Sequence, residues 1–432
     1  MIKNKNFLII AIGQLMSQFG NTLQRIALSL YILDITGSAK IFSVVIAIAM
    51  IPQILLAPIG GAIADRLNKK KIMIALDMLS GIILLAFTFS VSAGSLSVIA
   101  VGTLVFILQI LDSMYDPSAR AAIVNVVDKN DLEKANGIMT EIMAISMLLG
   151  PVAAGILYGI YGIKVVFIIN VISFFISAIL ESFLKIKYTK MNTEQSAIKV
   201  FINDTKETVN FLYKKNRFLL SVIILGTTIN IFLVPIYAIG VPYIEKELYK
   251  ASNTMYGISE GIIGLSMIIG ALITSHIAKK LPIEKIDKLF MLLLIPEAIM
   301  LIAVMPFILN HGGVSYLAYI IFTFSTFLFA MIITILSVIC NTYIQTKAPK
   351  NMIGKITSID TVLSLIFITI GQGIFGILYS GLSKNLFLIY VIVGICTLLS
   401  SLVYKKLVKK YFIKKEKLKE GLNNNNIVEE II

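Results

Sequence analysis

The sequence predicts an all-α integral membrane protein in which twelve transmembrane helices form two pseudo-symmetric bundles of six. Three observations support this fold class. The chain of 432 residues is 57% hydrophobic and only 14% charged, whereas a soluble domain carries about 25% charged residues. Its apolar residues gather in long runs, and part of its first half recurs in its second half. The composition therefore excludes an ordinary soluble globule.

The predicted spans are apolar runs long enough to cross a bilayer, which takes about 20 residues of helix. They lie at 7–33, 40–64, 72–93, 98–119, 136–158, 165–184, 218–243, 255–278, 288–309, 315–345, 352–380 and 386–404. We expect residues 1–184 to form an N-terminal six-helix bundle and 218–404 a C-terminal one. Residues 185–217 are predicted to be a cytoplasmic amphipathic linker, and 405–432 a basic, partly disordered cytoplasmic tail.

The basic residues predict the orientation of the chain. If the N terminus is inside, 32 of the 38 Lys and Arg residues lie on the same side as both termini. Cytoplasmic segments carry such an excess, so we expect a multi-pass protein of the plasma membrane with both termini in the cytoplasm. The net charge of +14 then faces anionic lipid, and no nucleic-acid partner is expected.

An internal repeat relates the two halves. Residues 123–158 align without gaps on 344–379, with 12 identities in 36 positions, and Gly-Ile-Leu-Tyr occurs in both. Two six-span halves related by an axis along the membrane normal are an arrangement found in transporters. The substrate site of such proteins lies between the halves near the bilayer midplane, so the repeat predicts a site there.

The stretch GGAIADRLNKKK at 60–71 is more specific than a basic membrane anchor. It resembles the loop between spans two and three of the major facilitator superfamily, G-x-x-x-D-R-x-G-R-R/K, with Asn68 in place of the loop glycine. The matching residues are Gly61, Asp65, Arg66, Lys69 and Lys70. The resemblance implies the major facilitator fold and a cytoplasmic gate, in which we place Asp77 and Arg120 as well. The alternative is a simple positive-inside anchor.

A second motif lies in span five. It resembles G-x8-G-x3-G-P-x2-G-G of drug:proton antiporters, with Ser146 and Ala154 replacing two glycines. The other matching residues are Gly137, Gly150, Pro151 and Gly155. Small residues permit close helix packing, and ordinary packing is the alternative interpretation. The resemblance implies export.

Residues 17–38 and 116–137 are similar to macrolide-efflux-like members of this superfamily. The resemblance implies a secondary active efflux transporter that expels an amphipathic small molecule, macrolide-like or another drug, while protons enter. Such a protein would confer multidrug or antibiotic resistance. A siderophore or metabolite exporter is an alternative, and a non-coupled lipid-flipping or receptor-like membrane protein is an alternative of another class.

Polar residues inside the spans mark a predicted substrate cavity. Gln14, Gln18, Asn21 and Arg25 follow one another at i, i+4, i+7 and i+11 on one face of span one. A polar stripe of this kind is costly against lipid, so we expect it to line the cavity, although some members could bind neighbouring helices. We add Gln109, Asn230 and Tyr237 to this set.

Five acids inside the spans are candidates for proton coupling, since ionisable groups in a bilayer are functional candidates by default. They are Asp112, Glu260, Asp360, Glu141 and Glu297. Asp112 comes first because span four lines the cavity in the superfamily that the chain resembles. A structural pair is the alternative for each acid, and Arg25 is expected to have a carboxylate partner.

No enzymatic site is predicted. The chain has no G-x-x-x-x-G-K-[ST] phosphate loop and no nucleophile–base constellation. Its two histidines are far apart in sequence and its two cysteines lie in apolar runs, so no metal or cofactor is expected. The predicted partners are the small-molecule substrate, protons and the lipid bilayer, with the protein as a monomer.

Overall fold

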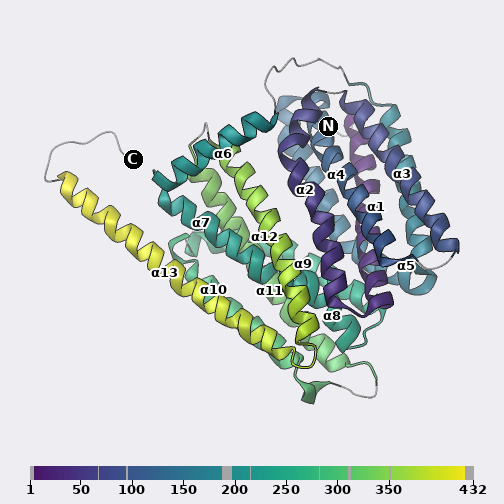
Figure 1. The fold of residues 1–432 in the computed structure, drawn as a ribbon. Helices are drawn as coiled ribbons and strands as arrows, with labels where there is room; N and C mark the ends of the chain where they lie inside the picture. The colour runs from purple at the N-terminus through teal and green to yellow at the C-terminus, as the bar shows by residue number, and fades with distance from the viewer. Residues whose placement is uncertain are drawn as a thin grey trace.

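The computed structural model describes residues 4–66, 68–93, 96–186, 197–214, 216–281, 283–309, 313–349 and 352–423. Within these ranges, side chains are not described at 57–66, 92–93, 129, 197–201, 280, 410 and 412–423. All regular elements of the described residues are helices, and they form two bundles that lie side by side (Figure 1).

The first bundle contains α1 to α5. Their bounds are Lys5–Thr36, Ala39–Arg66, Lys69–Ala93, Val98–Val126 and Leu132–Ser182, and the short 3-10 turn η1 (Lys129–Asp131) precedes α5. The backbone turns inside α5 at Gly162, where φ is 73° and ψ is −175°. Only glycine adopts this conformation readily, so α5 is two helices that cross the bundle in opposite directions.

Helix starts follow local capping chemistry. The Asn4 side chain accepts hydrogen bonds from the backbone N–H groups of Asn6 and Phe7 at the start of α1. Ser97 caps α4 in the same way through the N–H of Ala100. These side chains satisfy donors that a helix leaves unpaired at its N terminus, so α1 and α4 begin where the sequence supplies a cap.

Helix α6 (Ala197–Lys214) lies between the bundles, across the end of the molecule that carries the N terminus (Figure 1). Its Asp204 and Glu207 carboxylates lie 2.9 Å and 2.6 Å from the Lys355 amine of α12. Leu212 is buried, whereas Ile202 and Val209 are exposed. The linker helix is therefore anchored on the second bundle by ion pairs at the protein surface.

The second bundle begins with an irregular span. It runs through α7 (Arg217–Thr228), three π-helical segments η2 (Ile229–Leu233), η3 (Ile236–Gly240) and η4 (Ile244–Leu248), and the short α8 (Val241–Tyr243). Regular helices follow: α9 (Asn253–Lys280), α10 (Asp287–Ala303), α11 (Tyr316–Lys347), α12 (Ile353–Gly381) and α13 (Phe387–Asn423), with 3-10 turns η5 (Ile283–Lys285) and η6 (Pro306–Ile308). Wide π-turns often mark functional segments.

Each predicted span falls on a helix. In the described part of the chain, nine helical stretches are long and apolar enough to cross a membrane, and one of them is α5 with its internal turn. Two predicted spans are outside that set. Helix α10 has only 17 residues, and α1 carries the polar stripe that the sequence showed.

The repeat seen in the sequence has a structural counterpart. Gly150 of α5 packs on α1, where a Cβ would come within 2.6 Å of the Thr22 methyl group. Its equivalent Gly371 of α12 packs on the first span of the second bundle, where a Cβ would meet the Ile231 carbonyl at 2.5 Å. The same positions therefore make the same kind of contact within each half.

The two bundles approach closely at two helix crossings, α5 with α9 and α2 with α12. A Cβ on Gly155 would meet the Asn253 carbonyl and lie 2.9 Å from the Gly257 Cα. At the other crossing, a Cβ on Gly376 would overlap the Ser43 side chain. Both crossings lie toward the end opposite the N terminus, so the bundles are closed together there.

Candidate substrate cavity

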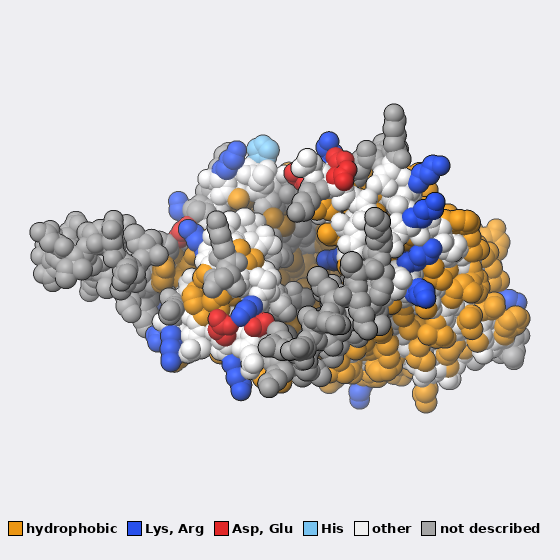
Figure 2. Space-filling model, turned by 90° about the horizontal axis from the view of Figure 1, so that it is seen from above, with side chains coloured by type: hydrophobic (Ala, Val, Ile, Leu, Met, Phe, Trp, Pro, Cys, Tyr) orange, Lys and Arg blue, Asp and Glu red, His pale blue; other side chains and the backbone are white. Residues whose placement is uncertain are grey.

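A cavity of about 500 Å³ lies between the bundles. Helices α1, α2, α4 and α5 supply most of its wall, α3 adds Asp77, and Ala238, Tyr256 and Gln372 come from the second bundle. Viewed onto the end that carries the N terminus, the molecule is recessed between its halves, and Lys and Arg side chains lie around the rim (Figure 2). A site between two halves is where the repeat predicted one.

The polar stripe of α1 largely faces this cavity. Gln18, Asn21 and Arg25 line it, and Gln109 joins them from α4. Gln14 is outside the lining, and its side-chain nitrogen is buried without a hydrogen-bond partner. Three of the four residues of the stripe thus line the cavity, and Gln14 does not.

A chain of amides positions Asn21. Asn170 of α5 donates from Nδ2 to Gln24 Oε1 at 2.6 Å and to Asn21 Oδ1 at 3.5 Å. Because its oxygen accepts from Asn170, the amide nitrogen of Asn21 is turned toward Asp112, and it donates to Oδ1 at 3.5 Å. Asp112 is therefore held at the cavity wall by α1.

The cavity wall is rich in acids. Asp77, Asp112 and Asp116 line it, and Arg25 is the one basic side chain of the described lining. The charges of Asp77 and Asp116 both act on Asp112. Like charges this close favour a bound cation or bound protons.

Arg25 has no carboxylate within ion-pair distance among the described side chains. Its charge nevertheless acts on Glu260 of α9, whose Oε1 accepts a 3.0 Å hydrogen bond from the Tyr256 hydroxyl. The charges of Arg25 and Glu260 also act on the Tyr237 hydroxyl. Arg25 of the first bundle thus interacts electrostatically with Glu260 of the second bundle. The carboxylate partner expected for Arg25 acts at longer range than an ion pair.

The remaining candidate acids lie away from this cavity. Glu297 is buried between α10 and α13 and accepts a 2.7 Å hydrogen bond from Thr397. Asp360 lines a separate pocket of about 310 Å³ together with Asn230, and Glu141 is exposed. Of the five predicted coupling acids, the structure brings Asp112 to the cavity wall and Glu260 into the electrostatic field of Arg25.

The predicted cytoplasmic gate is only partly within the described residues. Gly61, Asp65 and Arg66 belong to the end of α2, but their side chains lie outside the description. Lys69 and Lys70 begin α3, and Asp77 follows inside the cavity wall. Arg120 is exposed on α4, where its charge acts on Asp116.

The glycine motif of α5 makes the close contacts that small residues permit. Gly155 and Pro151 pack on Gly257 of α9, Gly150 packs on α1, and Ser146 lines the cavity. Ala154 is fully buried. Gly137 differs, because a Cβ there would meet nothing within 4 Å.

Sequence reasoning missed a polar cluster at the closed end. Lys246 lies 3.1 Å from the Asp34 carboxylate and donates to Asn253 Oδ1 at 2.5 Å. The Tyr158 hydroxyl donates to the other oxygen of Asp34 at 2.7 Å. Asp34 and Tyr158 come from the first bundle and Lys246 and Asn253 from the second, so this cluster, which we call the far-end latch, joins the halves.

The comparison of this sequence with protein families decides the identification. Residues 10–372 match the family profile of the Major Facilitator Superfamily. This chain belongs to the major facilitator superfamily. Membership makes the protein a multi-pass membrane transporter rather than an enzyme, and it confirms the family predicted from the loop and glycine motifs.

Relatives in this superfamily include exporters. The macrolide efflux protein A of Streptococcus pyogenes is 26% identical over 271 residues, which cover 62% of this chain and 65% of that protein. The staphyloferrin A transporter of Staphylococcus aureus is 25% identical over 268 residues, covering 60% and 64%. Both matches span less than two thirds of the relative's own length.

A solved structure confirms the predicted fold class. A bacterial homologue of the iron transporter ferroportin in its inward-facing state superposes with a TM-score of 0.72, covering 94% of this chain and 99% of that one at 15% identity. This chain therefore has the major facilitator fold, with twelve spans in two bundles. Nine described stretches meet a hydropathy and length criterion for a span, and one of them, α5, contains two spans.

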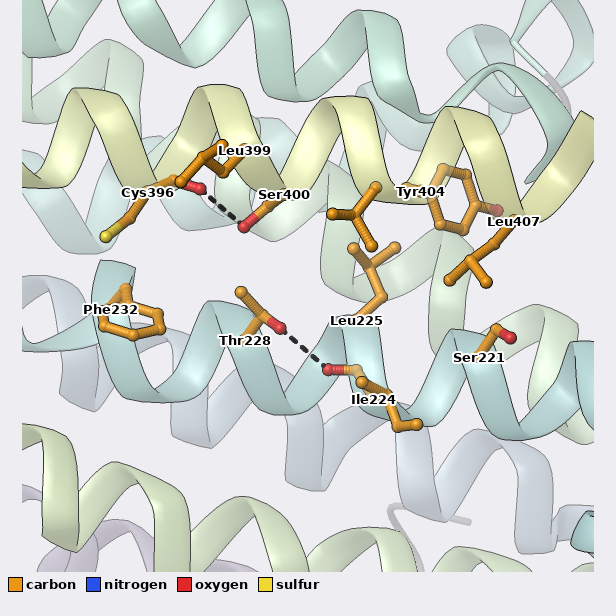
Figure 3. Close-up of a pocket in the computed structure, with 11 residues that line it drawn as sticks. Ser221, Ile224, Leu225, Thr228, Phe232, Cys396, Leu399, Ser400, Tyr404 and Leu407 are labelled. Carbon is orange, nitrogen blue, oxygen red and sulfur yellow. Dashed lines mark hydrogen bonds between the residues drawn. The ribbon is translucent and has the colours of Figure 1, made fainter.

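A second, lateral groove of about 310 Å³ lies between α7 and α13 (Figure 3). Its wall is mostly apolar, with Ile224, Leu225, Phe232, Leu399 and Leu407. Two of its hydroxyl groups bond within their own helices, Thr228 to the Ile224 carbonyl and Ser400 to the Cys396 carbonyl, and the Tyr404 hydroxyl donates to the Ile283 carbonyl. The groove offers no charged group to a ligand, so the central cavity is the candidate site of this major facilitator protein.

Proposed function

We propose that this protein exports an amphipathic, positively charged small molecule across the plasma membrane in exchange for protons, by alternating access. The observation that carries the proposal is the acidic cavity between the two bundles, with three aspartates and one arginine in its described lining. Acidic side chains in a cleft with low-dielectric walls attract cations. The macrolide efflux relatives support the same direction and class of substrate.

The distribution of basic residues supports the orientation. Placing both termini in the cytoplasm follows the positive-inside rule, and the far-end latch then lies at the extracellular side. The cavity in this arrangement faces the cytoplasm, where an exported compound would enter. A monomer suffices for this cycle, since both halves of the cavity come from one chain.

Exchange follows from competition for the same carboxylates. Asp112 can hold a proton or stand opposite a cationic group of the substrate, and the two states exclude one another. A proton that binds from outside would therefore favour release of the compound, and a compound that binds from inside would favour release of the proton. The closed and open arrangements of the two bundles alternate access to that acid.

A siderophore or metabolite exporter is the second candidate function. Arg25 faces the cavity, where a guanidinium could bind a substrate carboxylate in bidentate geometry, and one relative is named a staphyloferrin A transporter. An anionic substrate would use this single basic group, whereas a cationic substrate would use the three aspartates.

The test is a panel of macrolides, cationic dyes and carboxylate-bearing chelators, applied to a pump-deficient bacterial host that expresses the protein. The proposal predicts reduced susceptibility to, and energy-dependent efflux of, cationic amphipaths, with loss of both in Asp112→Asn and Asp65→Ala. Glu141→Gln serves as the control because Glu141 is exposed outside the cavity. Efflux restricted to carboxylate compounds would favour the siderophore alternative, and no efflux of any compound would contradict export.

A further inference from the structure

We propose that Asp77 and Glu181 form a carboxyl pair that binds the coupling proton behind the wall of the substrate cavity. The inference rests on the proposed proton antiport and deepens it, since it adds a buried carboxyl pair that exchanges its proton with the cavity beside Asp112. Neither residue was a predicted coupling acid: Asp77 was assigned to the gate, and Glu181 was not singled out in the sequence.

The pair is buried where two helices of the first bundle meet. Asp77 of α3 is 3% exposed and Glu181 of α5 is 1% exposed. Asp77 lines the cavity, whereas Glu181 is outside its lining. The charges of the two carboxyl groups act on each other. Asp77 can therefore pass a proton between the cavity and the more deeply placed Glu181.

The hydrogen bonds around the pair leave one oxygen of each carboxyl group without a partner, where a proton can bind. The Tyr115 hydroxyl donates to Glu181 Oε1 at 2.6 Å. Asp77 Oδ2 and Glu181 Oε2 are both buried without a hydrogen-bond partner. An unpaired carboxylate oxygen is costly in the interior. One proton on either carboxyl removes a charge from this buried pair.

The charge of the neighbouring Asp112 connects proton binding at the pair to substrate binding in the cavity. Tyr115 of α4 contacts Glu181, and Asp112 of α4 and Ser17 of α1 line the cavity together with Asp77. Among the described side chains, no ion pair involves Asp77 or Glu181. Negative charge on Asp112 acts directly on Asp77 and favours the protonated pair. A cationic substrate beside Asp112 would cancel that effect and release the proton.

A proton fits better than a metal ion. Hard cations take six or more oxygen ligands, and no group of three or more His, Cys, Asp or Glu side chains in the described part of the chain could hold a metal ion. Two carboxyl groups with one phenol donor are too few ligands for such an ion. Transport driven by a sodium gradient in place of a proton gradient would therefore overturn the assignment.

The experiment measures proton binding directly on the purified full-length protein. Infrared difference spectra over a pH titration follow protonated carboxyl groups, with and without erythromycin as the probe. We expect the wild type to show a carboxyl band that is lost as pH rises and is lost at lower pH when erythromycin is bound. Glu181→Gln and Asp77→Asn should lose this titration, whereas the control Glu297→Gln, a buried acid of the other bundle, should keep it.

A transport assay in proteoliposomes separates coupling from substrate binding. Glu181→Gln, whose side chain lies outside the cavity lining, should retain erythromycin exchange at equal pH but lose gradient-driven accumulation by about tenfold or more. If either variant does not fold, Tyr115→Phe replaces it: the carboxyl groups remain, and loss of the donor that stabilises the ionised Glu181 should move the midpoint of the band to higher pH.

The inference is overturned if both carboxyl variants keep the wild-type band titration and accumulation, or if a sodium gradient replaces the proton gradient in driving the wild type. A wild type that shows no gradient-driven movement of erythromycin contradicts the proposed function instead. The infrared titration still decides the carboxyl pair in that case, so the two failures are distinguishable.

Discussion

The Lys246 ammonium lies 3.1 Å from the Asp34 carboxylate and joins the end of α1 to the end of the irregular seventh span. These two residues belong to different bundles, and the Lys246 side chain is only 12% exposed. Tyr158 and Asn253 add a hydrogen bond from each bundle. This ion pair therefore stabilises the arrangement in which the bundles are closed at the end opposite the N terminus.

Lys246→Met should weaken that closed arrangement. Removal of one partner leaves Asp34 half-buried with only Tyr158 as a donor, and we expect a cost of about 1–2 kcal/mol. This cost shifts the balance between the two arrangements by about 5- to 30-fold. Distances between spin labels placed on the loops at the two ends should report more of the arrangement that is open at the latch.

Lys250→Met is the matched control for Lys246. Lys250 pairs with Glu247 at 3.4 Å in the same segment, but both residues belong to the second bundle and Lys250 is 63% exposed. Such a surface pair contributes little, so spin-label distances should not change. Equal effects of the two substitutions would show that the Asp34 contact does not bias the two arrangements.

Gly257→Ala should separate α5 from α9. A Cβ at this position would lie 2.5 Å from the Pro151 carbonyl and 3.0 Å from the Gly155 Cα. Both obstacles are backbone, so the helices must move apart, at a cost of about 1–3 kcal/mol. We expect a lower melting temperature and slower efflux. Gly137→Ala should do neither, because it meets open space and favours helix; equal melting temperatures for the two would contradict close packing at α5 and α9.

Arg25→Gln should change the charge preference of the cavity. It removes the one basic group of the described lining and leaves three aspartates. We expect binding of carboxylate compounds to fall by about tenfold, while binding of cationic compounds is kept or increased. Fluorescence polarisation with a cationic and an anionic dye measures both. Lys40→Gln, outside the cavity, is the control, and an unchanged preference in Arg25→Gln would argue that substrates do not reach this guanidinium.

Thr397→Val should destabilise the second bundle without affecting the substrate. Thr397 donates to the buried Glu297 at 2.7 Å, and the second carboxyl oxygen of Glu297 already lacks a partner. Loss of the donor costs about 1–3 kcal/mol, which a thermal unfolding scan detects. Ser400→Ala, whose hydroxyl bonds only within its own helix, should change the melting temperature far less. Reduced substrate binding with unchanged melting would indicate that Glu297 belongs to the substrate path.

The fold followed from the sequence because bilayer thickness fixes the length of each apolar run, and because small residues and basic loops have direct physical meaning. Gln18 and Asn21 were predicted to line the cavity because a polar stripe in a span is costly against lipid. Asp112 was selected because span four lines the cavity in the superfamily that the chain resembles. The far-end latch was missed because Asp34 and Lys246 lie at span ends, where charges are ordinary. Their role depends on a contact across 212 positions of sequence that no local pattern encodes.

Glu181 was missed for a related reason. It lies one residue before the end of α5, where an acid is expected to reach water, yet tertiary packing buries it against Tyr115. The one sequence feature that could have indicated its burial was the position of an acid inside the last turn of an apolar run. Conversely, Glu297 was placed among the coupling acids because burial in a span is visible in sequence, whereas the neighbour it faces is not.

The most direct test of the central claim is a flux measurement in proteoliposomes that contain the wild-type protein and a trapped pH-sensitive dye. An imposed erythromycin gradient should drive protons in the direction opposite to the compound, and Asp112→Asn should abolish that proton flux. Erythromycin movement without proton movement, or with protons moving in the same direction, would contradict the account.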